Sequence, residues 1–188
     1  MSGITIIDTE LKDLKRIQPF MAGDERGELI KTYEQGQYAK YGLDFVTSEI
    51  MFSTSCKGVL RGLHFQTKAP QAKLVTVIKG EVWDVAVDLR KTSGTCGKWY
   101  GTYLSEENRE ALYIPEGFAH GFLALEDDTV LVYQCKNVYL KEEDTGILWS
   151  DADLNIQWPT DKVDKLIISQ RDQGFVGYLD FMDKYGGL

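Results

Sequence analysis

The chain has 188 residues, 43% of them hydrophobic and 12% aromatic, which suits one domain over residues 1–188. Its net charge of −8 argues against a nucleic-acid partner, because a surface of that sign repels phosphate backbones. We also expect no membrane partner, since no apolar run reaches the roughly 18 residues that a spanning helix needs.

The N-terminus and the cysteines predict a cytoplasmic protein. The first residues alternate acidic and basic side chains and lack the apolar stretch and cleavage site of a signal peptide. Cys56, Cys96 and Cys135 are widely spaced and fit no metal or disulfide pattern. We interpret them as reduced thiols.

Most segments alternate apolar and polar residues, and turn signals such as Ala22-Gly23-Asp24 separate them at short intervals. One face of residues 81–89 carries Trp83, Val85, Val87 and Leu89. One face of residues 129–140 carries Leu131, Tyr133, Cys135 and Tyr139. Many short strands with frequent turns indicate an antiparallel sandwich or barrel.

Two short helical segments are expected among these strands. Residues 105–112 predict a helical turn with Ser105 as its N-cap, and residues 161–168 predict a short helix. The stretch after Gln173 gives little indication of its structure.

Two glycine-framed segments resemble the two cupin motifs. In the first, Gly58 precedes His64 by six residues and Gly80 follows Lys73 by seven; the second is Pro115-Glu-Gly-Phe-Ala-His120. The metal-binding form carries a second His and a Glu where this chain has Gln66 and Lys73. A protonated Lys offers no lone pair and repels a cation, so we predict no metal and no cofactor. The same Lys suits an enolate oxygen that develops in a transition state.

Further motifs extend this resemblance over residues 20 to 172. They occur in order as 61–66, 71–75, 84–90, 115–122, Tyr133, 146–151, Trp158-Pro159 and 169–172. Together they are similar to the dTDP-4-keto-6-deoxyglucose 3,5-epimerase family. The resemblance implies an all-β fold, a cupin double-stranded β-helix (jelly-roll) barrel with a few short peripheral helices. It also implies a metal-free homodimer.

The resemblance also implies roles for individual residues. His64 would be the general base, Tyr133 the general acid on the opposite face of the sugar, Asp172 the partner of His64, and Lys73 the group that holds the C4 oxygen. The substrate contacts would include Arg26, Arg61, Gln66, His120, Tyr139, Asp144 and Arg171. Tyr139 would stack on the base.

Elementary chemistry agrees with these roles. A ketone at C4 acidifies the hydrogens at both C3 and C5, because either carbanion delocalises onto the same oxygen. His titrates near neutral pH and can remove the proton, whereas Tyr arrives protonated and can donate one from the other face. The sequence therefore predicts an epimerase that inverts C3, C5 or both in a nucleotide-linked 4-keto-6-deoxyhexose, for deoxysugar and cell-surface polysaccharide (lipopolysaccharide O-antigen) biosynthesis.

The strand before Gly58 departs from the family pattern. Glu49 and Met51 stand where the family usually has Gln-x-Asn, the residues that read the base. An ionised Glu only accepts hydrogen bonds, so it would favour the amino group of cytosine. The nucleotide is therefore expected to be dTDP or, from this departure, CDP.

Other interpretations stay open at this point. His64 could be a buried structural histidine, Tyr133 and Tyr139 could be packing residues, and Asp172 could cap a chain end. Asp84 and Asp88 are expected to be structural, and Trp149 and Trp158 to belong to the core. A 3,4-ketoisomerase or a non-catalytic nucleotide-sugar-binding cupin would use the same barrel, although the ketoisomerase needs no acid on the far face.

Overall fold

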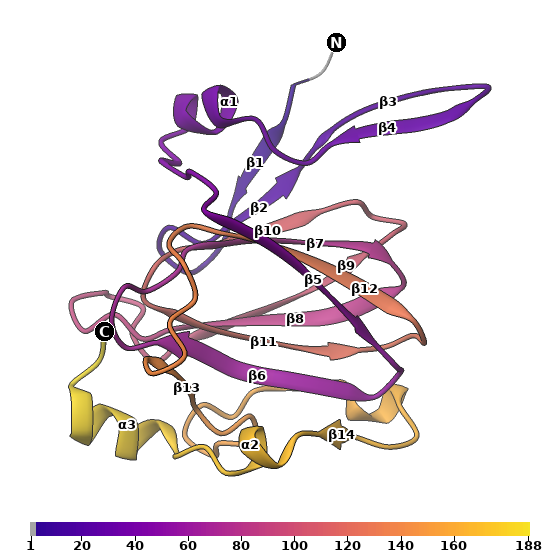
Figure 1. The fold of residues 1–188 in the computed structure, drawn as a ribbon. Coiled ribbons are helices and arrows are strands. Elements are labelled where there is room, and N and C mark those ends of the chain that lie inside the picture. The colour runs from indigo at the N-terminus through magenta and orange to yellow at the C-terminus, as the bar shows by residue number, and fades with distance from the viewer. Residues whose placement is uncertain (1–2) are drawn as a thin grey trace.

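A computed structural model describes residues 3–188, in which two antiparallel sheets face each other (Figure 1). The first sheet has the order β1 (Thr5–Asp8), β2 (Lys15–Gln18), β10 (Ala111–Ile114), β7 (Lys73–Lys79), β12 (Thr129–Cys135), β5 (Glu49–Ser55). The second has the order β13 (Asp144–Gly146), β6 (Val59–Gln66), β11 (Phe118–Ala124), β8 (Glu81–Asp88), β9 (Trp99–Ser105). The predicted all-β architecture is confirmed.

A two-stranded hairpin stands apart from both sheets. It consists of β3 (Phe20–Asp24) and β4 (Gly27–Lys31), which pair with each other alone, and it projects from the body of the molecule (Figure 1). The short helix α1 (Gln35–Lys40) follows it. An isolated two-stranded hairpin is only marginally stable in water, so we expect this one to be stabilised by contact with another surface.

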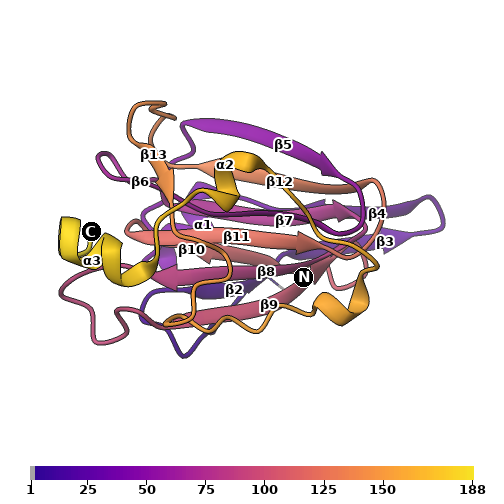
Figure 2. The same ribbon diagram turned by 90° about the horizontal axis from the view of Figure 1, so that it is seen from below.

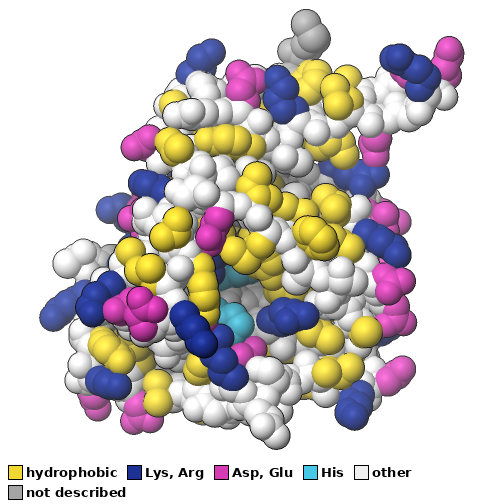
Figure 3. Space-filling view, viewed as in Figure 1, with side chains coloured by type: hydrophobic (Ala, Val, Ile, Leu, Met, Phe, Trp, Pro, Cys, Tyr) yellow, Lys and Arg dark blue, Asp and Glu magenta, His cyan; other side chains and the backbone are white. Residues whose placement is uncertain are grey.

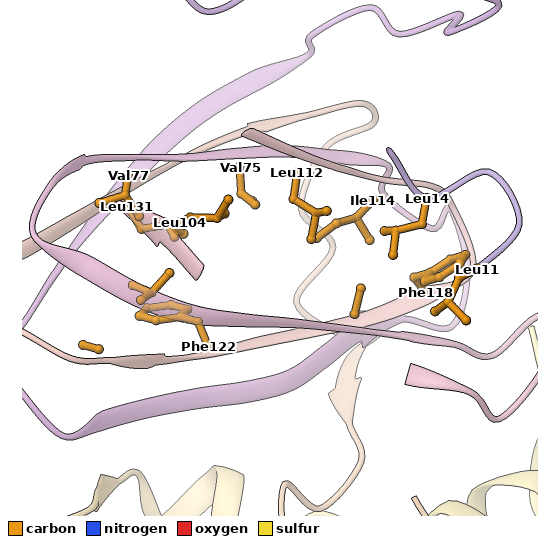
Figure 4. Packing of buried hydrophobic residues seen from close by; sticks show 13 residues of the cluster. Leu11, Leu14, Val75, Val77, Leu104, Leu112, Ile114, Phe118, Phe122 and Leu131 are labelled. Carbon is orange, nitrogen blue, oxygen red and sulfur yellow. The ribbon is translucent and has the colours of Figure 1, made fainter. Parts of the chain in front are cut away.

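The space between the sheets is filled by apolar side chains that the two-residue period turns inward. Figure 4 shows Val75 and Val77 of β7 opposite Phe118 and Phe122 of β11. On β8, Val82 and Ala86 belong to this cluster, whereas Val85 and Val87 pack on the other side of the sheet. The predicted shared face of residues 81–89 is therefore correct, but both faces of this strand are buried.

The C-terminal segment covers the outer face of the second sheet, which explains why β8 is apolar on both sides (Figure 2). It contains a 3-10 turn (Thr160–Lys162), β14 (Ile167–Ile168), α2 (Gln170–Gln173) and α3 (Tyr178–Tyr185). Trp149 and Trp158 pack in this layer against Leu60 and Val163, as expected for core residues.

The two predicted helical segments have different outcomes. At Ser105 the chain makes a single turn, in which the backbone nitrogen of Asn108 donates to Ser105 Oγ at 3.0 Å, and it enters β10 at Ala111. The helix predicted over 161–168 is wrong beyond Lys162. The backbone nitrogen of Ile167 instead donates to the carbonyl of Gly58 at 2.8 Å, and β14 runs parallel to β6. Pairing with an existing strand has overridden the local helical pattern.

Within residues 3–188, no helix is long and apolar enough to cross a membrane.

At Gly58 the barrel and the C-terminal segment come into close contact. Its φ is +85°, and a Cβ built there would lie 2.0 Å from the carbonyl oxygen of Lys165. We expect Gly58→Ala to lower the free energy of unfolding by roughly 2–4 kcal/mol, since backbone strain and a steric clash add. Thermal denaturation measures this, with Gly94→Ala as control because its Cβ meets nothing within 4 Å. Equal melting temperatures for the two variants would contradict the assignment.

Candidate active site

A cavity of about 270 Å³ opens between the two sheets at one end of the barrel. It is lined by Met51, Phe52, Ser53, Arg61, His64, Phe65, Gln66, Gln71, Lys73, Tyr133, Cys135, Tyr139 and Asp144. An adjoining cavity of about 430 Å³ shares Arg61 and His64 with it and adds Arg171 and Asp172. Figure 3 shows this hollow, with histidine inside it and Lys or Arg at its rim.

His64 of β6 and Asp172 of α2 form a hydrogen-bonded pair. Nε2 of His64 lies 3.0 Å from Oδ1 of Asp172, whose Oδ2 accepts from the backbone nitrogen of Gly62 at 3.1 Å. Burial opposes ionisation of Asp172, but the hydrogen bond and charge of His64 and the Gly62 donor outweigh it, so its pKa is lowered. Because an ionised Asp172 only accepts, the hydrogen of His64 resides on Nε2. Nδ1 is left with the lone pair that a general base needs.

The position of Asp172 comes from local capping. It lies in the first turn of α2, where Ser169 is the N-cap and accepts from the backbone nitrogen of Asp172 at 3.0 Å. Its side chain is buried against β6. The interpretation of Asp172 as a chain-end cap is therefore incomplete, because its carboxylate contacts His64.

Lys73 begins β7 and projects from the sheet opposite His64. It makes no ion pair within residues 3–188, and burial lowers its pKa from 10.5 against the opposing charges of Cys135, Asp144 and Asp84. A half-buried ammonium without a carboxylate partner is arranged to receive an anion.

Tyr133 lies on β12, next to β7 in the same sheet. Its hydroxyl is 3.3 Å from Oγ of Ser53 on β5, and burial is the main reason that its pKa is raised above 10.0. It therefore stays protonated at neutral pH and can donate. His64 and Tyr133 line the same cavity from facing sheets, an arrangement that can remove and add protons on different faces of a bound ring.

His120 is buried behind Tyr133 instead of lining the cavity. Its Nε2 lies 2.9 Å and 3.0 Å from the two oxygens of Asp84, and its ring packs edge-on to Tyr133 with centroids 6.1 Å apart. The structure thus supports the expectation that Asp84 is structural, and Asp88, which accepts from Arg90, Ser93 and Thr95, has a turn-stabilising role of the same kind. Direct contact between His120 and a substrate has no support in this geometry.

The rim carries the charged residues that the sequence singled out. Arg171 forms an ion pair with Asp144 at 2.7 Å, and the hydroxyl of Tyr139 donates to Asp144 at 3.0 Å. Within residues 3–188, the exposed Arg61 forms no ion pair and makes only long hydrogen bonds, to Ser55 Oγ at 3.3 Å and the Thr54 carbonyl at 3.4 Å. Its guanidinium therefore remains available to an anion at the rim.

Tyr139 reaches the cavity by a route that strand alternation did not predict. β12 ends at Cys135, and Asn137 has a φ of +68°, so Tyr139 lies in a loop. The expectation that Tyr133 and Tyr139 share one strand is wrong, although both line the cavity.

Four other predicted contacts remain: Gln66, Glu49, Met51 and Arg26. Gln66 accepts from the backbone nitrogen of Leu140 at 2.6 Å and donates to the carbonyl of Ala69 at 2.9 Å, so it holds the loop that carries Tyr139. Glu49 accepts from Gln71 Nε2 at 2.8 Å and from the backbone nitrogen of Tyr139 at 3.3 Å, while Met51 lines the cavity. Arg26 lies at the tip of the β3–β4 hairpin, paired with Asp24, outside this cavity.

Sequence reasoning assigned no role to Gln71, Ser53 or Cys135, which line the cavity. Gln71 precedes Lys73 by two residues, so the two-residue period of extended chain could have predicted that both side chains point to the same side. Ser53 lies two residues after Met51 on β5 and gave the same signal. No group of three or more His, Cys, Asp or Glu side chains within the described residues could hold a metal ion.

Comparison with known proteins gives consistent results. Residues 8–178 match the sequence profile of dTDP-4-dehydrorhamnose 3,5-epimerase. The enzyme of that name from Methanothermobacter thermautotrophicus is 48% identical over 175 residues, which covers 93% of this chain and 95% of the relative.

Solved structures agree with the sequence relatives. The dTDP-4-dehydrorhamnose 3,5-epimerase from Elizabethkingia anophelis superposes with a TM-score of 0.89 at 42% identity, covering 95% of this chain and 98% of that one. The dTDP-6-deoxy-D-glucose-3,5-epimerase from Legionella pneumophila, solved with dTDP-4-keto-L-rhamnose, gives 0.91 at 39% identity, covering 97% and 96%. These neighbours confirm the predicted cupin barrel, and this chain belongs to the dTDP-4-dehydrorhamnose 3,5-epimerase family.

Proposed function

We propose that this chain is an isomerase that epimerises C3 and C5 of a dTDP-linked 4-keto-6-deoxyhexose, without metal or cofactor. One observation carries the proposal: the His64–Asp172 pair and Tyr133 line one cavity from facing sheets, with Lys73 in its wall. Family membership supports the sugar and the nucleotide. The comparisons support dTDP in place of CDP, and both oxygens of Glu49 accept hydrogen bonds within the chain.

The proposed steps follow from the protonation states. Lys73 holds the C4 oxygen, Nδ1 of His64 takes the hydrogen at C3 or C5, and the electron pair moves to that oxygen as an enolate. Asp172 stabilises the imidazolium that forms. Tyr133 then returns a proton to the carbon from the other face, and exchange with water resets both residues before the second carbon reacts. Arg61 is placed to hold the diphosphate, and Tyr139 to stack on the base.

The alternatives of a 3,4-ketoisomerase and a non-catalytic binding cupin fit less well. A ketoisomerase has no use for a protonated tyrosine on the far wall, and a binding module has no use for a His64 oriented by a buried carboxylate. The supply of a deoxysugar for cell-surface polysaccharides and a cytoplasmic location are part of the proposal.

The roles of base and acid can be separated with the nucleotide-linked 4-keto-6-deoxyglucose in deuterated water. We expect His64→Ala to lose at least ~100-fold in both exchange and inversion, since it removes the base. Tyr133→Phe should retain exchange on the His64 face while inversion falls much further. NMR reads both, with Tyr185→Phe, an exposed tyrosine on α3, as control. Equal losses of exchange and inversion in Tyr133→Phe would contradict separate acid and base roles.

The charge of Lys73 predicts the alkaline side of the pH profile. Burial lowers its pKa below 10.5, so the ammonium loses its proton, and with it the stabilisation of the enolate, as the pH rises through that lowered value. Tyr133 does not titrate first, because burial raises its pKa above 10.0. We expect Lys73→Arg to be slower at neutral pH but to move the alkaline loss of kcat/KM upward, since guanidinium stays protonated above pH 12. An unchanged alkaline limb would assign it to another group.

We further propose a homodimer formed through the edge of the first sheet. β5 is an edge strand beside the cavity, and its Ile50 and Phe52 are 67% and 73% exposed. Exposed apolar edges are usually covered. A second copy placed there could also receive the β3–β4 hairpin and bring Arg26 to the substrate, which accounts for its distance from this chain's own cavity.

Light scattering at micromolar concentration tests the dimer. We expect twice the mass of one chain for the wild type and a shift toward the monomer for Ile50→Lys. Leu179→Lys on α3, at another exposed apolar residue, is the control and should leave the mass unchanged. A monomeric wild type would refute the proposal.

A further inference from the structure

The half-buried side chain of Phe175 contacts His64 from the C-terminal segment, just after α2. The centroids of the two rings lie 5.6 Å apart, and their planes make an angle of 81°. This is the edge-to-face arrangement that aromatic pairs prefer. The C-terminal segment therefore holds His64 in two ways, through the hydrogen bond of Asp172 and through the packing of Phe175.

The ring of Phe175 occupies space that a missing side chain leaves open. Gly146 on β13 is the register partner of His64 on β6. A Cβ built on Gly146 would lie 2.4 Å from Cε2 of Phe175 and 2.6 Å from its Cδ2, so the ring packs directly on the glycine. Residues opposite each other in an antiparallel pair normally have neighbouring side chains. Phe175 thus packs on His64 in place of the neighbour that β13 lacks.

The ring is held in this place from two sides. The next residue, Val176, is fixed to the barrel, because its carbonyl accepts from the backbone nitrogen of Leu148 at 2.9 Å. The guanidinium of Arg171 lies over the ring of Phe175, 5.2 Å from its centroid. These contacts leave the ring little freedom to move away from His64.

The hydrogen bond to Asp172 leaves the imidazole of His64 one rotation. The ring is fixed at its Cβ and at Nε2, which lies 3.0 Å from Oδ1 of Asp172. It can still tilt about the line through these two atoms, and Nδ1 lies to one side of that line. A tilt would redirect the lone pair of Nδ1 without breaking the hydrogen bond. The edge-to-face contact with Phe175 opposes such a tilt, because it favours one angle between the two planes.

We propose that Phe175 is a positioning residue for the general base, which sets the plane of the His64 imidazole and so aims Nδ1 at the substrate carbon. Asp172 determines which nitrogen carries the lone pair, and Phe175 determines where that lone pair points. The inference rests on the proposed function, because it takes His64 as the base. Phe175 lies beyond the last motif, residues 169–172, so motif spacing did not indicate this role.

The rate of hydrogen exchange in deuterated water tests this role. Phe175→Leu keeps an apolar side chain but loses the flat ring, so we expect kcat for exchange to fall roughly 10-fold or more, since small misplacements of a catalytic group are costly. KM should stay within about 3-fold, because the ring does not line either cavity of the site. Phe175→Tyr keeps the ring and should restore kcat to within about 3-fold of the wild type.

Tyr178→Leu is the matched control. Tyr178 is another half-buried aromatic residue of the same segment, and it also packs on a glycine, since a Cβ on Gly97 would lie 2.6 Å from its hydroxyl oxygen. It makes no contact with His64. Its replacement should lower the melting temperature as Phe175→Leu does, but should leave kcat unchanged.

The two histidines of the chain provide a spectroscopic readout that a general loss of structure would not reproduce. In NMR spectra of histidine-labelled protein, Phe175→Leu should shift the ring carbon-bound hydrogen signals of His64, because these hydrogens lose an aromatic neighbour. The signals of His120, which packs on Tyr133, should stay in place. The nitrogen signals should show that His64 keeps its hydrogen on Nε2, since Asp172 is still present.

Three results would overturn the proposal: a wild-type kcat in Phe175→Leu, an equal loss of kcat in Tyr178→Leu, or a His64 hydrogen that moves to Nδ1 in Phe175→Leu. The last would mean that the variant acts through the hydrogen bond of Asp172. Failure of the proposed function looks different, because His64→Ala would then exchange hydrogen at the wild-type rate, whatever the rate of Phe175→Leu.

Discussion

The hydrogen bond between His64 and Asp172 joins residues that are 108 positions apart, and the geometry of the site depends on it. It exists because the chain returns to β6 after the barrel is complete. The pairing of β14 with β6, the left-handed turn at Gly58 and the cap at Ser169 all act to deliver one carboxylate to one imidazole. Without that return, His64 would remain on β6 with neither a fixed tautomer nor a group to stabilise its charge.

One end of the barrel interior is filled by packed apolar side chains, and the other end holds the cavity with its polar and charged side chains. On β12 the same inward face carries Leu131 in the core and then Tyr133 and Cys135 at the cavity. The packed end supplies a rigid, weakly polar wall, and this wall raises the pKa of Tyr133 and lowers that of Lys73. The fold thus prepares an acid that keeps its proton and a cation that lacks a counter-ion.

The sequence was most informative where spacing and chemistry coincide. Motif spacing identified His64 and Lys73, and the two-residue period placed Tyr133 on an inward face; the structure brings all three to one cavity. Hydrogen-bond partners were not predictable, because they depend on which loops meet. Gln66 turned out to hold a loop and His120 to pair with Asp84, although both stand at motif positions.

The error over residues 161–168 and the hydrogen bonding of Glu49 have the same origin. In each case the residue types alone do not indicate the partner that the segment finds. In each case that partner is distant in sequence: the carbonyl of Gly58 for Ile167, and Gln71 for Glu49. Local pattern gives the options of a segment, whereas tertiary contacts select among them.

The net charge of −8 and an anionic substrate are compatible because charge acts locally at this site. Asp144 neutralises Arg171 at the rim, which removes one candidate cation from the phosphate. Arg61 and Lys73 have no such partner within the described residues, and they lie at the mouth and in the wall of the same cavity. A diphosphate near Arg61 would leave the sugar ring extending toward Lys73 and His64. The unpaired cations therefore define a direction for the substrate, from the exposed rim to the buried proton-transfer groups, that the total charge of the chain conceals.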